Sequence, residues 1–112
     1  MSQDGPLISR PERTFTALRD AVAAVAPQRL PEFFEKMQGA FVRAGEEDSG
    51  TPIHMFYREW AAVIEIERFP HAAARLHAAE RAIDSQDPNI RNAAIREAGD
   101  IVRAAHREIA GG

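Results

Sequence analysis

The sequence contains no cysteine among its 112 residues, and only one of its 14 basic residues is a lysine, Lys36. The missing thiols exclude disulfide bonds, thiolate zinc sites and a cysteine nucleophile. A long apolar run is also missing, so no segment predicts a membrane span. Residues 1–9 lack the basic and apolar regions of a signal peptide, and we therefore expect a cytoplasmic protein.

Signatures of catalysis and of nucleic-acid binding are equally scarce. No serine lies in a Gly-x-Ser-x-Gly elbow, and the chain has no Gly-rich phosphate loop. The basic residues form no run and the net charge is −3, which argues against a non-specific nucleic-acid binder. We therefore expect a non-catalytic protein that uses no cofactor and is not a non-specific nucleic-acid binder.

Histidines and carboxylates offer few candidate metal or acid–base sites. His77 and Glu80 are three residues apart and would share one face of a helix. This His-x-x-Glu pair has no second copy, which a di-metal bundle site requires, so we expect no bound metal. Glu65 and Glu67 diverge on a helix, and we interpret them as part of a solvated face.

What the chain does contain is 45% hydrophobic and 28% charged residues, the proportions of a globular domain. Its length fits one domain. Gly5 and Pro6 indicate a flexible N-terminal arm over residues 1–8. The remainder, residues 9–112, is expected to form a single helical domain.

Strand signals are nearly absent, whereas helix starts and stops recur along the chain. Ser9 and Glu12 have capping-box spacing and predict a first helix that continues to about residue 24. A second helix begins near Pro31 and ends at Gly45, a residue suited to the left-handed position after a helix. Three further starts are marked by proline: Thr51-Pro52, Phe69-Pro70 and Asp87-Pro88. The predicted fold class is all-α, a compact bundle of four to five helices with a long C-terminal helix.

The aromatic residues expected in the core are concentrated in one part of the chain. Seven of the eight aromatic residues lie between residues 33 and 69, so the aromatic core should belong to the second and third helices. The third helix is apolar on two sides, which is typical of a central helix. We expect four core anchors: Phe33, Phe56, Trp60 and Ile64. Trp60 and Tyr57 also suit an exposed binding hot spot, but the mid-helix place of Trp60 favours the core.

The predicted fifth helix, residues 88–110, carries an apolar arc of about 140°, wider than the roughly 100° that packing on one core requires. Within the arc, five residues keep heptad spacing: Ile95, Ala98, Val102, Ala105 and Ile109. Either the whole arc packs inside its own bundle, or these residues bind a second chain. On the second interpretation, Ile90 and Ile101 face the domain's own core.

Three segments carry a family resemblance: AVAPQRLPEF, FFEKMQGAFVRA and FYREWAAVIEIERFPHAAARLHAAE. A tryptophan-centred helix is followed by a proline-marked break and an alanine-rich helix, with Trp60, Pro70 and Leu76 in those places. Over about residues 15–80 the chain resembles a family of small uncharacterised actinobacterial proteins. Members look like antitoxin-type proteins, some thought to be encoded beside small ribonuclease-like toxins. The resemblance implies a protein-binding role but no site residue.

Together these features predict a non-catalytic protein–protein interaction module. Its leading form is an antitoxin-like or regulatory protein that covers another protein with its C-terminal helices. The alternative is a self-associating domain whose final helices form a homodimer seam, which must be self-complementary under two-fold symmetry. A nucleic-acid-binding regulator is the third possibility, but it would need a basic recognition helix that neither final helix shows.

Overall fold

The computed structural model describes residues 5–111. Its elements are α1 (Phe15–Val25), a 3₁₀ turn (Pro27–Arg29), α2 (Leu30–Glu47), α3 (Thr51–Glu67), α4 (Pro70–Ala82) and α5 (Pro88–Gly111). No strand occurs within the described residues, and the predicted all-α class with a long C-terminal helix is confirmed.

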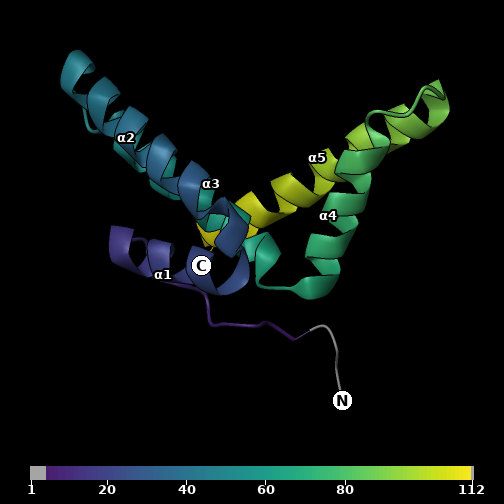
Figure 1. The fold of residues 1–112 in the computed structure, drawn as a ribbon, viewed down its shortest axis with the longest axis horizontal. Helices are drawn as coiled ribbons and strands as arrows, with labels where there is room; N and C mark the ends of the chain where they lie inside the picture. Colours follow the sequence, from purple (N-terminus) through teal and green to yellow (C-terminus); the bar gives the residue numbers. More distant parts are fainter. Residues whose placement is uncertain (1–4, 112) are drawn as a thin grey trace.

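The helices form two hairpins that meet at one end and diverge at the other (Figure 1). One arm consists of α2 and α3, and the other consists of α4 and α5. The Cα radius of gyration is 15.4 Å, against about 13 Å for a typical domain of this length. The bundle is therefore open on the side between the two arms.

Proline marks the start of three helices, as the sequence predicts. Pro52 and Pro70 lie in the first turns of α3 and α4, and Pro88 begins α5. The Asp87 carboxylate accepts a hydrogen bond from the backbone N–H of Asn89 at 2.9 Å, which caps the start of α5. These starts are local, because a cap and a proline act within one turn.

The predicted start of the first helix is wrong. No capping box forms at Ser9 and Glu12, and α1 begins six residues after Ser9, at Phe15. The Thr14 hydroxyl caps it by accepting a hydrogen bond from the backbone N–H of Ala17 at 3.2 Å. The preceding residues are instead extended and bonded to distant helices, so tertiary contacts override the local signal.

The predicted end of the second helix is also wrong. α2 continues through Gly45 to Glu47, and the left-handed residue that follows is Asp48, with φ of 50°. Aspartate tolerates this conformation better than most residues with a side chain. The turn between α2 and α3 is therefore shorter than the sequence suggests.

The main core forms around α3, which contacts α1, α2, α4 and α5. Phe33, Phe56, Trp60 and Ile64, the expected anchors, are all buried in it. The Phe33 ring centroid lies 5.1 Å from those of both Phe56 and Trp60. Phe15 of α1 stacks on Phe33 at 5.6 Å, so the aromatic core also includes the first helix, contrary to expectation.

Candidate protein-binding groove

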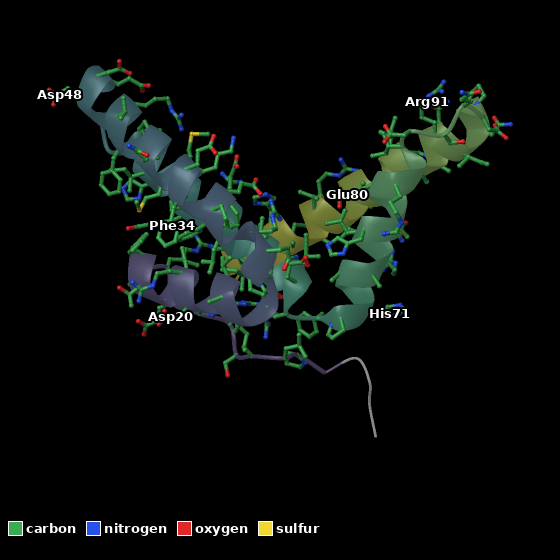
Figure 2. The ribbon with its side chains drawn as sticks, viewed as in Figure 1. Asp20, Phe34, Asp48, His71, Glu80 and Arg91 are labelled. Carbon is green, nitrogen blue, oxygen red and sulfur yellow. The ribbon has the colours of Figure 1, made fainter. Side chains whose placement is uncertain are left out.

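A groove of about 660 Å³ lies between the two arms. One side of α3 forms its floor, α2 lines one wall, and α4 and α5 line the other. Figure 2 shows Glu80 on the side of α4 that faces the opposite arm. The groove therefore draws side chains from four helices that are far apart in the sequence.

Apolar side chains are exposed on the floor and on one wall of this groove. Met55 on α3 is 55% exposed and Val102 on α5 is 37% exposed. Half-buried Val63 and Leu76 also line the groove, and Trp60 borders its floor. An apolar surface of this shape, open to solvent, is characteristic of sites that bind another protein.

The charged residues that line the groove are predominantly acidic. Five are carboxylates and three are cations: Glu32, Glu47, Glu59, Glu67, Glu80, Arg29, Lys36 and Arg43. The Arg29 guanidinium pairs with Glu32 at 3.1 Å and also lies over the Trp60 ring. Acidic groups remain in excess, so the groove favours a partner with positive charge beside its apolar surface.

A histidine–carboxylate pair lies at the closed end of the groove. His77 Nε2 is 2.8 Å from Glu67 Oε1, and Glu67 is buried. The expected solvation of Glu67 is wrong, because α4 folds back over the end of α3 and His77 pairs with this carboxylate instead of sharing a site with Glu80. His106 also lines the groove, and its Nδ1 is buried without a hydrogen-bond partner in the described structure.

These histidines and carboxylates do not converge as a metal site would require. Within residues 5–111, no group of three or more histidine, aspartate or glutamate side chains is arranged to hold an ion. A histidine–glutamate pair alone supplies too few ligands for zinc or iron. The pair instead orients His77 toward the groove, where it can donate or accept a hydrogen bond.

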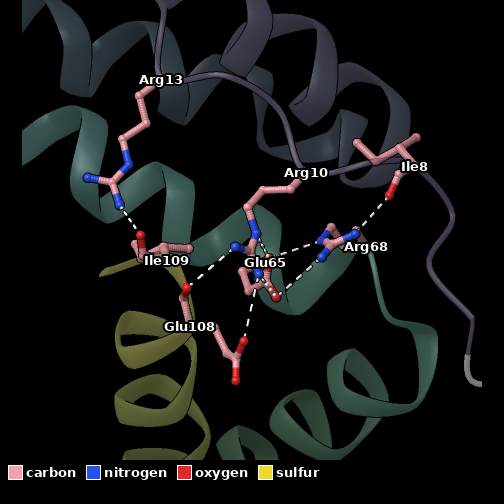
Figure 3. A network of polar contacts seen from close by, with 7 residues as sticks. All are labelled: Ile8, Arg10, Arg13, Glu65, Arg68, Glu108 and Ile109. Atoms are coloured by element: carbon pink, nitrogen blue, oxygen red, sulfur yellow. Dashed lines mark hydrogen bonds and ion pairs between the residues drawn. The ribbon is translucent and has the colours of Figure 1, made fainter. Parts of the chain in front are cut away.

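Glu65 forms a second polar cluster with two arginines, and none of these residues lines the groove (Figure 3). Arg10 binds both of its carboxylate oxygens, at 3.0 and 3.2 Å, and Arg68 Nε donates to Oε1 at 3.0 Å. Burial acts to raise the pKa of Glu65, but the hydrogen bonds and charges of Arg10 and Arg68 outweigh it and lower that pKa. Glu65 is thus a buried, ionised group, and its expected place on a solvated face is wrong.

The same cluster fastens the N-terminal segment to the ends of α3 and α5. The backbone N–H of Leu7 donates to the Arg68 carbonyl at 2.7 Å, and Arg68 donates to the Ile8 carbonyl at 3.1 Å. Arg13 donates to the Ile109 carbonyl near the end of α5 at 2.8 Å (Figure 3). Of the expected flexible arm, residues 1–4 lie outside the described residues, whereas Leu7 and Ile8 contact the domain.

The structure divides the five heptad residues of α5 between two environments. Ile95 and Val102 are exposed and Ala98 is half-buried, whereas Ala105 and Ile109 are buried in the chain's own core. A partner-binding role for the last two is therefore wrong, because α5 packs on α3 toward its C-terminal end. Only the part of the heptad on the diverging arm is available to a partner.

Of the two α5 residues expected to face the core, the structure supports one. Ile101 is buried, at 8% exposure, whereas Ile90 is 50% exposed near the tip of the arm. The expectation for Ile90 is wrong because the hydrophobic core does not extend to the first turns of α5. Helical periodicity identifies a shared face but not the point along the helix at which the core stops.

The sequence interpretation did not identify the contributions of α3 and α4 to the groove. The partner-binding residues expected from the sequence lie on the fifth helix alone, and nothing in that expectation indicates that Met55, Val63 and Leu76 line the same groove as Val102. The signal was the second apolar side of the third helix, which includes Met55 and Ile66. A helix with two apolar sides either lies between two layers or leaves one side for a partner.

No helix within the described residues is both long enough and apolar enough to cross a membrane. Comparisons with protein-family models, curated proteins and solved structures return no match for this chain. The groove is therefore the feature of this chain that points to a function.

Proposed function

We propose that this protein is a non-catalytic interaction module that binds a helical element of a protein partner in the groove between its two arms. The observation that carries the proposal is the exposure of Met55 on the α3 floor and of Val102 on the α5 wall of one groove. An α-helix is about 10–12 Å across with its side chains and can bury an apolar stripe against such a floor and wall.

The proposal includes the antitoxin-like or regulatory role that the family resemblance implies. In that case the partner is a small ribonuclease-like toxin in the cytoplasm, and the module covers its surface. The acidic lining supports a partner with basic residues beside its apolar stripe. The exposed part of α5 supports the predicted use of a C-terminal helix, restricted to Ile95 and Val102.

The test compares two valine substitutions in a binding titration. Val102 lines the groove, whereas Val42 is 55% exposed on α2 and does not line it. Trp60 is the only tryptophan and borders the groove, so its fluorescence reports occupancy. The titrant is a partner obtained by co-purification and then produced separately.

We expect Val102→Asp to weaken binding by roughly tenfold or more, because a charge without a counter-ion becomes buried. Val42→Asp should bind like the wild type. Equal binding by both variants would show that the groove is not the interaction surface. If no other protein or second copy associates with the chain, the proposed function is wrong.

A further inference from the structure

We infer that, in the isolated protein, the groove is filled by the α4/α5 arm of a second copy, so that two chains interlock as a symmetric dimer. This inference rests on the proposed function, since it names the occupant of the same groove. Each molecule would supply both a groove and the arm that fills the groove of its partner.

The first argument is the order of side chains on the inner face of α5. Ile95 and Val102, at 51% and 37% exposure, are two turns apart and lie on the same side of the helix. Gly99 lies between them, although a glycine inside a helix costs roughly 0.5–1 kcal/mol relative to alanine. A second helix can approach α5 closely at this glycine.

Close packing inside the monomer does not explain why residue 99 is a glycine. A Cβ added there would meet only the guanidinium of Arg103, with its nearest atom at 2.9 Å. That guanidinium is the far end of a flexible, exposed side chain and can move away. The place beside Gly99 is therefore covered only by the Arg103 side chain, and a second helix could approach there if that side chain moved aside.

The second argument is symmetry. A two-fold dimer requires a surface that complements itself. If two α5 helices pack antiparallel with the axis between Ala98 and Gly99, Ile95 meets the partner's Val102 on both sides of the axis. The large residues then flank the small ones, and the helices approach at the centre.

The same antiparallel pairing fills both grooves. α5 extends from the tip of its arm, near Arg91, to the junction of the two arms (Figures 1 and 2). An antiparallel α5 laid on the inner face of the first therefore points its own tip toward that junction, and the pairing ends near His106 because Ala105 and Ile109 are covered by the chain's own core. Each α4/α5 arm then lies between the two arms of the other copy.

The third argument is surface area. The chain exposes 7260 Å², whereas a folded monomer of 12.4 kDa exposes about 6,100 Å². Exposed apolar side chains on the diverging arms, among them Met55, Ile95 and Val102, belong to this larger surface. A stable dimer covers about 800 Å² on each partner. The excess of about 1,200 Å² over a compact monomer is larger than this, so the chain exposes more surface than one dimer contact would cover.

The fourth argument is charge. Arg96 is exposed on α5 beside the Ile95–Val102 stripe and makes no ion pair within the described residues, whereas Arg103 pairs with Asp100 at 2.6 Å. The groove that would receive them has five lining carboxylates and three lining cations. Insertion of an arginine-bearing arm into an acidic groove places opposite charges together and favours this occupant.

The main test is sedimentation equilibrium of the full chain with three single variants. The wild type should be a dimer, and Val102→Asp should raise its dissociation constant by about tenfold or more. Ile95→Asp should raise the dissociation constant in the same way. Because Ile95 lies farther from the core than Val102, this variant tests the dimer contact even if Val102→Asp folds poorly. Val42→Asp, the matched control on α2, should remain dimeric.

A cross-linking test examines the arrangement. The wild type has no cysteine, so a disulfide formed by Gly99→Cys can only join two chains. Because a side chain at position 99 should weaken the dimer, the oxidation is done at a protein concentration at which sedimentation shows that Gly99→Cys is still dimeric. We expect oxidation to link this variant and to leave Val42→Cys unlinked, and a dimeric Gly99→Cys that fails to link would overturn the antiparallel arrangement.

Two other outcomes separate the inference from the proposed function. A monomeric wild type that binds a different protein, with Val102→Asp defective in that binding, would overturn the second copy as occupant and leave the proposed function standing. A dimer that persists in Val102→Asp and dissociates in Val42→Asp would overturn both.

Discussion

At the scale of single residues, Glu65 shows how a buried charge is maintained. Its side chain is 8% exposed, and Arg10 and Arg68 together bind both of its oxygens. A buried carboxylate is tolerated only when such partners replace the lost water. Arg10 is 55 residues away in sequence, so no local pattern around Glu65 revealed the pairing.

Glu65 should make the stability of the protein sensitive to acid. Because its folded-state pKa is lowered, the stabilisation is fully present above the unfolded pKa and is lost as the pH falls through the folded one. We expect Glu65→Gln to be less stable than the wild type at neutral pH, with the difference shrinking below about pH 4.5. Urea denaturation of both proteins across this pH range measures the difference in their free energies of unfolding. A difference that does not change with pH would show that Glu65 is not a stabilising ionised group.

Trp60 should act mainly through the core, since it is 4% exposed and lies against Phe33. Trp60→Ala should lower the free energy of unfolding by roughly 3–5 kcal/mol, because a large buried side chain leaves a cavity. Chemical denaturation followed by circular dichroism gives the value. Val42→Ala, at an exposed position, is the control and should change stability little. A Trp60 variant as stable as the wild type would instead favour an interface role.

At the scale of elements, helices with local start signals could be predicted from the sequence. Pro52, Pro70 and Pro88 mark the starts of α3, α4 and α5 because proline and cap act within one turn. The start of α1 could not be predicted, because the residues around Ser9 are held by contacts to α3 and α5. Glu12 therefore never completes the capping box that its spacing suggests.

The groove could be predicted only in part, for a related reason. Heptad spacing correctly grouped Ile95 with Val102, but it also included Ala105 and Ile109, which the core covers. Where the core ends along α5 depends on how far the arms diverge. That divergence is a property of the tertiary packing around α3, and single-helix periodicity does not contain it.

Replacement of Gly99 by alanine should have opposite effects on the stability of the monomer and on dimerisation. Gly99→Ala should stabilise the folded monomer by roughly 0.5–1 kcal/mol, since alanine favours helix and its Cβ displaces only the Arg103 side chain. The same methyl group should weaken dimerisation, because it lies where two α5 helices meet. Denaturation at low protein concentration measures the first effect, and sedimentation equilibrium measures the second. If Gly99→Ala strengthened dimerisation as much as it stabilised the monomer, no second helix would approach α5 at Gly99.

At the scale of the whole molecule, two adjacent residues on α5 distinguish folding from association. Ile101 is 8% exposed and packs in the core around α3, whereas Val102 is 37% exposed and faces the groove. Helical geometry separates their side chains by about 100° around the axis. The same substitution at each position therefore places a charge in the core in one case and in the groove in the other.

We expect Ile101→Asp to unfold the chain, because its carboxylate would be buried among apolar groups without a counter-ion. Val102→Asp should keep the helical circular dichroism spectrum and a similar melting temperature at low protein concentration. On size-exclusion chromatography it should elute later than the wild type, as a folded monomer. Should Val102→Asp unfold as fully as Ile101→Asp, the inner face of α5 belongs to the monomer core. The interaction surface would then have to lie elsewhere, and the exposed side chains of α2 on the opposite side, Phe34 and Phe41, would be the next to test.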